Sequence, residues 1–193
     1  MLSEKLKKYN VILASQSPRR QLLLSGLDIP YTLKVKEVDE SWPSHLKREE
    51  IALYLAEKKA GAFNDELAED TLIITADTIV WIDGQVLGKP VDFDDALRML
   101  KKLSGNIHDV VTAICLKSKK KTHSFYSLTK VTFKELSEEE IKYYVENYKP
   151  YDKAGSYGAQ EWIGYVAIKH IEGSYFNVMG LPTRLLYDEL LRF

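Results

Sequence analysis

The first third of the chain alternates short apolar runs with leucines at helical spacing. Val11 to Ala14 is an apolar run of strand length, and Ser17 and Pro18 follow it before a periodic set of leucines. Serine is a preferred N-cap and proline suits the first position of a helix, so the pattern predicts a strand, a loop and a helix that ends at Gly26. The alternation from Ile29 to Val35 predicts a half-buried strand after that helix.

The middle of the chain gives two clear helical patterns around a buried strand. Apolar residues recur every three or four positions from Glu49 to Phe63, which predicts an amphipathic helix. Leu72 to Ala76 is apolar apart from one threonine, as expected of a strand covered on both faces, and Asp77 stands at its C-terminal end. Asp83-Gly84 favours a tight hairpin turn between two short strands, Thr78 to Ile82 and Gln85 to Leu87, and a helix from Asp94 to Leu103 follows.

The second half repeats the alternation of strands and helices, which predicts an α/β fold. The predicted elements are strands at Asp109 to Leu116 and Phe125 to Phe133, a helix from Ser137, a strand near Tyr165 to Ile171 and a helix from Leu181 to Phe193. Because some neighbouring strands form hairpins, the sheet should be mixed and twisted, with flanking helices. No linker or repeat interrupts the chain, so we expect residues 1–193 to form a single domain, with two lobes around a cleft.

Composition narrows the classes of partner. The 27 basic and 28 acidic residues give a formal net charge of −1, which provides no general field for nucleic acid or an acidic membrane. The basic run Lys117 to Lys121 lies between two strand patterns and suits a solvated hairpin tip. The single cysteine, Cys115, excludes an intramolecular disulfide, and its apolar neighbours favour a core role. The sequence has no secretion-signal pattern and no apolar run of about 18 residues, so we expect a cytoplasmic protein without a membrane partner.

The segment from Ser15 to Arg20 has the form of a phosphate site. It places two serines and two arginines where a strand end meets a helix N-terminus. Such an N-terminus presents unpaired N–H groups, and arginine can bind phosphate through two hydrogen bonds. Taken alone, the same residues suit an ordinary capped helix with solvated arginines.

Carboxylates form the second candidate group. Glu37, Asp39 and Glu40 lie in an acidic loop, and Asp77 follows a buried strand. Mg²⁺ usually takes one or two protein carboxylates and completes its shell with water and substrate phosphates, so these acids suffice for a metal site. The loop acids also suit a solvated surface, whereas an acid directly after a buried strand is harder to explain in that way.

Three further polar residues lie beside backbone-tightening glycine or proline. They are Lys89, Lys153 and Gln160. Lysine offers a point charge to phosphate, and glutamine offers one donor group and one acceptor to the edge of a base. Each is a weak signal alone. The four histidines form no HExxH motif, and GxxxxGK[ST] and GxGxxG are absent, so zinc, P-loop and dinucleotide sites have little support.

Taken in order, these motifs resemble the Maf family of nucleotide pyrophosphatases, which is related to the inosine-triphosphate pyrophosphatases. The resemblance covers about Val11 to Leu186. The matching blocks are LASQSPRR (13–20), VDE (38–40), ADT (76–78), GKP (88–90), LSGNIHDVVTA (103–113), DKAGSYGAQ (152–160) and EGSYFNVMGLP (172–182). Seven blocks in sequence order make the match specific, although any single block would be weak.

The resemblance assigns roles to individual residues. It implies Asp77 as the acidic catalytic residue, assisted by Glu40 and Lys89, and a divalent cation (Mg²⁺, Mn²⁺ or Co²⁺) held by Asp77, Glu40 and Asp39. Four residues would line the triphosphate: Ser15, Arg20, Lys89 and Lys153. Three residues separate the branches of the family, and here they are Arg19, Thr78 and Gln160, which is similar to the dTTP/UTP branch.

The implied activity is hydrolysis of dTTP or UTP to the monophosphate and pyrophosphate, a house-cleaning role in the nucleotide pool that extends to modified pyrimidine nucleotides. Two alternatives are kept: a nucleotide-binding regulator of cell division without hydrolysis, and a phosphatase of monophosphate esters. A homodimer also stays open. The chain departs from the family pattern at Ser156, Ala159 and Glu161. At Glu161 a glycine usually follows the glutamine, and this departure concerns the base pocket more than the metal centre.

Overall fold

The computed structural model describes residues 2–193. The chain divides into two compact units. Unit 1 comprises the chain up to Asp77 together with Thr112–Ser127 and Gly180–Phe193, and unit 2 comprises Thr78–Val111 and Leu128–Met179. Within residues 2–193, no helix combines the length and the apolar character that crossing a membrane requires.

A mixed sheet of seven strands forms the framework, in the order β2-β1-β3-β5-β6-β7, with β4 paired to β3. The strands are β1 (Asn10–Leu13), β2 (Thr32–Leu33), β3 (Thr71–Ile82), β4 (Gln85–Leu87), β5 (Ile107–Lys117), β6 (Thr122–Phe133) and β7 (Ile168–Glu172). β1 runs parallel to β2 and β3, whereas the β3–β4 and β6–β7 pairs are antiparallel. The expected α/β class, a mixed sheet with flanking helices, is confirmed.

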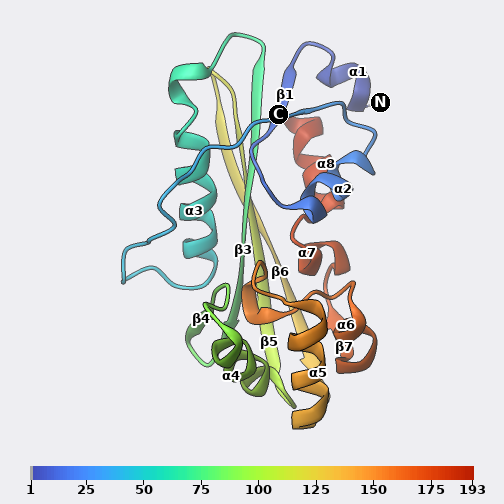
Figure 1. The fold of residues 1–193 in the computed structure, drawn as a ribbon. Helices are drawn as coiled ribbons and strands as arrows, with labels where there is room; N and C mark the ends of the chain where they lie inside the picture. Colours follow the sequence, from blue (N-terminus) through green and yellow to red (C-terminus); the bar gives the residue numbers. More distant parts are fainter. Residues whose placement is uncertain (1) are drawn as a thin grey trace. The chain divides into compact units, whose positions relative to one another are not determined.

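In unit 1, helices cover both faces of the strands (Figure 1). α3 (Glu49–Gly61) lies on one face, and α2 (Pro18–Ser25) and α8 (Thr183–Arg192) lie on the other. The short α1 (Leu2–Leu6) contacts α8, and a 3-10 turn, η1 (Asn64–Glu66), follows α3. Fully buried aliphatic side chains from these elements, such as Leu13, Leu24 and Ile74, form the core of this unit.

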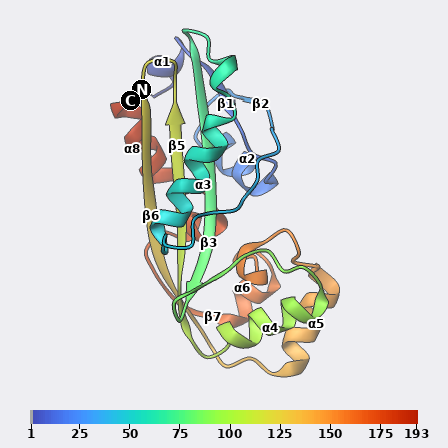
Figure 2. The same cartoon turned by 90° about the vertical axis from the view of Figure 1, so that its left-hand side faces the viewer.

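Unit 2 contains the remaining helices, which Figure 2 shows from the side. They are α4 (Phe93–Leu103), α5 (Glu138–Tyr148), the 3-10 turn η2 (Ala154–Ser156), α6 (Trp162–Ala167) and α7 (Tyr175–Met179). α4 packs against α5 and η2. One apolar cluster, which includes Leu100, Phe133 and Ile163, fills the space between these helices and the strand ends.

Several predicted element ends are confirmed by hydrogen bonds. Ser17 caps α2 and accepts from Arg20 N, and Pro18 is its first residue. Ser137 caps α5 in a reciprocal capping box with Glu140, which satisfies two N–H groups at once. The hairpin turn has positive φ at both central residues, 50° at Asp83 and 75° at Gly84, as a type I′ turn requires.

Two predicted strands are one strand in the structure. Leu72 to Ala76 and Thr78 to Ile82, predicted separately, are joined through Asp77 in β3. Its parallel neighbour β1 ends at Leu13, opposite Ile74, whereas β4 pairs with Val80 to Ile82. Asp77 therefore lies within a continuous strand, just beyond the carboxyl end of the neighbouring β1.

Two other strand predictions are wrong in extent. Of Ile29 to Val35 only Thr32–Leu33 pairs, at the edge of the sheet, and both residues are exposed; Pro30 lacks the N–H that a ladder needs. The segment predicted as a strand from Tyr165 begins as the end of α6, and β7 starts only at Ile168. Buried Ile163 and Ala167 are four residues apart, which is helical spacing.

Candidate functional site

The turn between β1 and α2 is tied together by its own serines. Ser17 N donates to Ser15 Oγ at 3.2 Å, and Arg20 N donates to Ser17 Oγ at 3.5 Å. Ser15 is buried, with 6% of its surface exposed. The predicted phosphate segment is thus a well-formed helix N-terminus.

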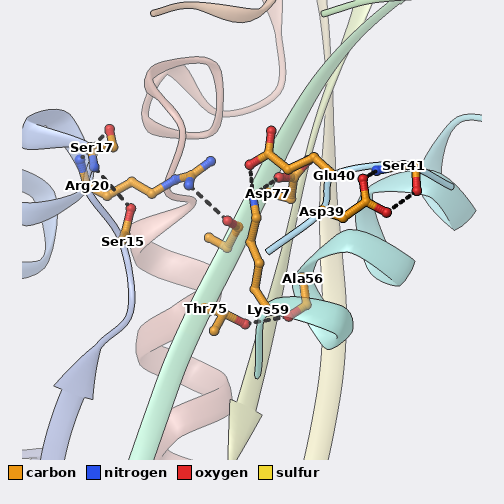
Figure 3. Close-up of polar contacts among 11 residues, drawn as sticks. Ser15, Ser17, Arg20, Asp39, Glu40, Ser41, Ala56, Lys59, Thr75 and Asp77 are labelled. Carbon is orange, nitrogen blue, oxygen red and sulfur yellow. Dashed lines mark hydrogen bonds and ion pairs between the residues drawn. The ribbon is translucent and has the colours of Figure 1, made fainter. Parts of the chain in front are cut away.

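Arg20 is not a solvated arginine. Its Nε donates to Gly180 O at 2.9 Å and its Nη1 to Ala76 O at 2.8 Å, so the guanidinium reaches from α2 to β3 (Figure 3). Burial lowers the pKa of Arg20, and the negative charges of Asp77 and Glu40 oppose that shift. The predicted arginine and the predicted carboxylates therefore act on one another electrostatically within unit 1.

Two of the three predicted metal ligands converge on one cation. Lys59 Nζ lies 2.8 Å from Glu40 Oε1 and is also paired with Asp77 Oδ1. The Asp77 side chain is 10% exposed and the Lys59 side chain 18%. Figure 3 shows Lys59 rising from α3 to both carboxylates. The early acidic loop and β3 thus supply a pair of carboxylates that share a positive charge.

Asp39 faces away from this pair. Its Oδ1 accepts from Ser41 N at 3.0 Å and its Oδ2 accepts from Lys58 Nζ at 3.0 Å and from the Ser41 hydroxyl. These hydrogen bonds, that of the Ser41 side chain first, lower the pKa of Asp39 to about 2. Its role as a metal ligand stays a prediction; in this structure its carboxylate holds the loop that carries Glu40. Glu37 is exposed.

Lys59 is the site residue that the sequence interpretation did not identify. It lies three residues after Ala56 and four after Leu55, both buried positions of α3. A lysine beside the apolar face of an amphipathic helix usually directs its ammonium group to a specific partner. Its position beside the apolar face could have indicated a buried partner for Lys59. It could not indicate which partner, because Glu40 and Asp77 are 19 and 18 residues away along the chain.

In unit 2, the GKP and DKAG segments are held together by the hydrogen bond from Gly155 N to Gly88 O, at 3.0 Å. Lys89 is exposed, whereas Lys153 is buried at 7% exposure. Lys153 Nζ lies 2.6 Å from Asp152 Oδ1 and 3.1 Å from Glu161 Oε1.

The remaining predicted residues concern the base. Gln160 Oε1 is buried and, among residues 2–193, has no hydrogen-bond partner. Thr78 is half-buried on β3, next to Asp77 in the chain, and Arg19 is half-buried at the start of α2. Gln160 is therefore the residue of this group with an acceptor atom still to be satisfied.

The donor set fits a hard divalent cation with few protein ligands. No group of three or more histidine, cysteine, aspartate or glutamate side chains between residues 2 and 193 is placed to hold a metal ion. Glu40 and Asp77 nevertheless already meet at one positive charge, the Lys59 ammonium. Mg²⁺ needs only one or two carboxylates when water and phosphates complete its shell.

Comparison with known proteins places the chain in a family. The model of the family described as "Maf-like protein" matches residues 10–193. A dTTP/UTP pyrophosphatase of Phocaeicola vulgatus is 57% identical over 188 residues, which cover 97% of each chain. The proteins of the same name from Flavobacterium johnsoniae and Porphyromonas gingivalis strain W83 are 52% identical (98% of each chain) and 54% identical (98% of this chain, 97% of the relative).

Among solved structures, the Staphylococcus aureus Ham1 protein matches with a TM-score of 0.43 and 16% identity, over 64% of this chain and 71% of that one. The family model and the near-full-length relatives agree with the ordered motifs of the sequence. This chain belongs to the Maf family.

Proposed function

We propose that the protein is a cytoplasmic, metal-dependent nucleoside-triphosphate pyrophosphatase that converts dTTP or UTP to the monophosphate and pyrophosphate. The observation that carries the proposal is the convergence of Glu40, Asp77 and Lys59 beside the half-buried Arg20 guanidinium. Relatives that are 52–57% identical over nearly their full length bear the name of this activity.

The proposed reaction is attack of water on the α-phosphorus. The water oxygen bonds to that phosphorus, the bond from the phosphorus to the α-β bridging oxygen breaks, and pyrophosphate leaves with the bridging oxygen. Asp77 accepts the proton that the water loses, because a carboxylate held by a neighbouring ammonium group is oriented for this task. When a divalent cation is held by Glu40 and Asp77, it supplies Lewis-acid stabilisation of the phosphate charge.

The cationic and hydroxyl side chains provide the electrostatic part of the proposal. Ser15 and Arg20, at the N-terminus of α2, suit the phosphate groups, since such an end already presents N–H groups and partial positive charge. Lys89 and Lys153 neutralise charge on the departing pyrophosphate, which is the main task of the protein in this type of transfer. The base is selected by Arg19, Thr78 and Gln160. Gln160 Oε1, which has no hydrogen-bond partner among residues 2–193, accepts a hydrogen bond from the base.

Asp77→Asn tests the proposal. The amide cannot take the proton or hold the cation in the same way, so turnover of dTTP should fall at least a hundredfold, the usual contribution of a positioned acid or base. Monophosphate and pyrophosphate are quantified separately, with Mg²⁺, Mn²⁺ and Co²⁺ in turn. Asp65→Asn, at an exposed aspartate of η1, is the matched control. Wild-type turnover by Asp77→Asn would show that the catalytic assignment is wrong.

The same assay separates the two alternatives. A nucleotide-binding regulator would bind dTTP without forming either product, and a phosphatase of monoesters would release inorganic phosphate. The paired carboxylates favour hydrolysis, because a binding protein has no need of a proton acceptor beside its phosphate site.

A further inference from the structure

Glu161, which stands where the family pattern usually has glycine, is built into a polar network of unit 2. Its Oε2 accepts a hydrogen bond from the Tyr144 hydroxyl, and its Oε1 lies 3.1 Å from Lys153 Nζ. The Glu161 side chain is 20% exposed and that of Lys153 is 8% exposed. The side chain is therefore not a solvated surface acid but a link between α5 and the segment that carries Lys153.

Tyr144 connects this carboxylate to the backbone of the loop. Its hydroxyl donates to Glu161 and accepts from Gly158 N at 3.0 Å. Tyr144 is fully buried and stacks on Tyr148, and burial together with Glu161 raises the pKa of Tyr144, so its hydroxyl keeps the proton that it donates. Glu161 N in turn donates to Gly158 O at 3.0 Å, which closes a turn over residues 158–161.

This turn places the Glu161 carboxylate beside the Gln160 amide. A Cβ atom added at Gly158 would lie 2.8 Å from Glu161 Cδ, 3.0 Å from Glu161 Oε2 and 2.9 Å from Gln160 Nε2. The carboxylate and the amide nitrogen thus share the space over Gly158, which only glycine leaves open. A carboxylate attracts the N–H end of an amide and repels its oxygen. Gln160 Oε1 is buried and, among residues 2–193, has no hydrogen-bond partner.

The orientation of a glutamine amide decides which pyrimidine it can pair with. Uracil and thymine present an N3–H donor between carbonyl oxygens, whereas cytosine presents an N3 acceptor beside an amino donor. A rotating amide can offer its oxygen to uracil or its nitrogen to cytosine, because its terminal torsion is broad and roughly two-fold. An amide held in one orientation accepts from N3–H and discriminates against cytosine.

We propose that Glu161 is a specificity-determining positioning residue: bound to Tyr144 and Lys153, it holds the Gln160 amide with its oxygen toward the base, and so selects uracil and thymine over cytosine. This inference rests on the proposed function, since it concerns the base of the same nucleoside triphosphate. It assigns a task to one of the positions at which the motif departs from the family pattern.

The test compares kcat/KM for UTP and CTP in the wild type, Glu161→Gln and Tyr144→Phe. Glu161→Gln keeps the shape of the side chain and removes the charge, and Tyr144→Phe removes only the hydroxyl. In both variants the ratio of kcat/KM for UTP to kcat/KM for CTP should fall about tenfold. A change of this size lies within the range of discrimination that one polar contact to a substrate provides. Glu146→Gln, an exposed glutamate of α5, should keep the wild-type ratio.

The ratio separates positioning from stability, because a partly unfolded enzyme loses activity toward both nucleotides equally. The double variant should lower the ratio no further than the stronger single one, since both act on one contact. An unchanged ratio in Glu161→Gln, with Tyr144→Phe also unchanged, overturns the inference while leaving the proposed function intact. A wild-type protein that forms no pyrophosphate from UTP or dTTP would instead remove the proposed function itself.

Discussion

Lys59 contributes directly to the electrostatics around Asp77. Its ammonium group is the charge that Glu40 and Asp77 share, and the Asp77 side chain is only 10% exposed. Without that charge, the Asp77 carboxylate would face a second negative charge, that of the 48% exposed Glu40 side chain. Lys59 therefore offsets the repulsion between the two acids.

Lys59→Met should lower the free energy of unfolding by about 1–3 kcal/mol, because it leaves a nearly buried acid without its cation. Mn²⁺ should then raise the melting temperature more in the variant than in the wild type, since the metal replaces the lost charge. Thermal unfolding with and without Mn²⁺ measures both effects. Lys58→Met is the control, because its partner Asp39 has a 72% exposed side chain and such pairs contribute little. Equal metal effects in the two variants would contradict the shared-cation model.

The hydrogen bonds to Asp39 set the pH at which it titrates. They lower the pKa of Asp39 from 3.8 to about 2, and the Ser41 side chain is the largest cause. A depressed folded-state pKa stabilises the folded chain above the ordinary aspartate pKa of 3.8, and this stabilisation is lost as pH falls toward 2. We expect carboxyl NMR to show the Asp39 midpoint near 2 in the wild type and higher in Ser41→Ala. An unmoved midpoint would mean that Ser41 is not the cause.

Residue-level prediction from sequence identified the acids but not all of their partners. Asp77 and Glu40 were predicted as a pair and the structure brings both to one cation. Adjacency in the VDE motif grouped Asp39 with them, yet neighbouring residues of an extended loop point in different directions, and Asp39 turns to Ser41. Lys59 was missed because its charge is used across a long sequence separation, which no local pattern records.

At the scale of elements, the sequence predicts what local chemistry controls. The caps Ser17 and Ser137 and the Asp83-Gly84 turn are local, and all are confirmed. The continuity of β3 through Asp77 depends instead on which strands lie beside it, and the boundary between α6 and β7 depends on burial of one helical face. Both depend on tertiary neighbours, so apolar periodicity alone did not predict them.

The space around two glycines, Gly155 in η2 and Gly61 in α3, gives predictions of opposite sign for their substitution by alanine. Gly155 has φ of 69°, and a Cβ there would lie 2.8 Å from Val80 Cγ2, so Gly155→Ala should cost about 2 kcal/mol of stability. Gly61, at the end of α3, has open space around it, so Gly61→Ala should stabilise by about 0.5 kcal/mol. Urea unfolding of the two variants measures both changes. A neutral Gly155→Ala would show that η2 yields to the added methyl group.

At the scale of the whole molecule, three strands have residues in both units. β3 belongs to unit 1 up to Asp77 and to unit 2 from Thr78, and β5 and β6 are divided at Val111 and at Ser127 in the same way. Loss of either unit would leave half of each strand without its packing. Each unit has buried side chains of its own. Because three strands continue from one unit into the other, we nevertheless expect the two units to unfold cooperatively.

The expected single domain over residues 1–193 can be tested by asking whether the two units unfold together. Trp42 lies in unit 1 and Trp162 in unit 2, so variants that retain only one of these tryptophans, with phenylalanine at the others, report each unit separately. Because β3, β5 and β6 are shared, the fluorescence of each variant should show one urea transition that coincides with the far-UV circular dichroism transition of the same variant. Each variant is compared with its own circular dichroism curve, because the phenylalanine substitutions change stability. If the fluorescence midpoint of either variant were separated from that curve, the units would unfold independently, and 1–193 would be two domains that share strands.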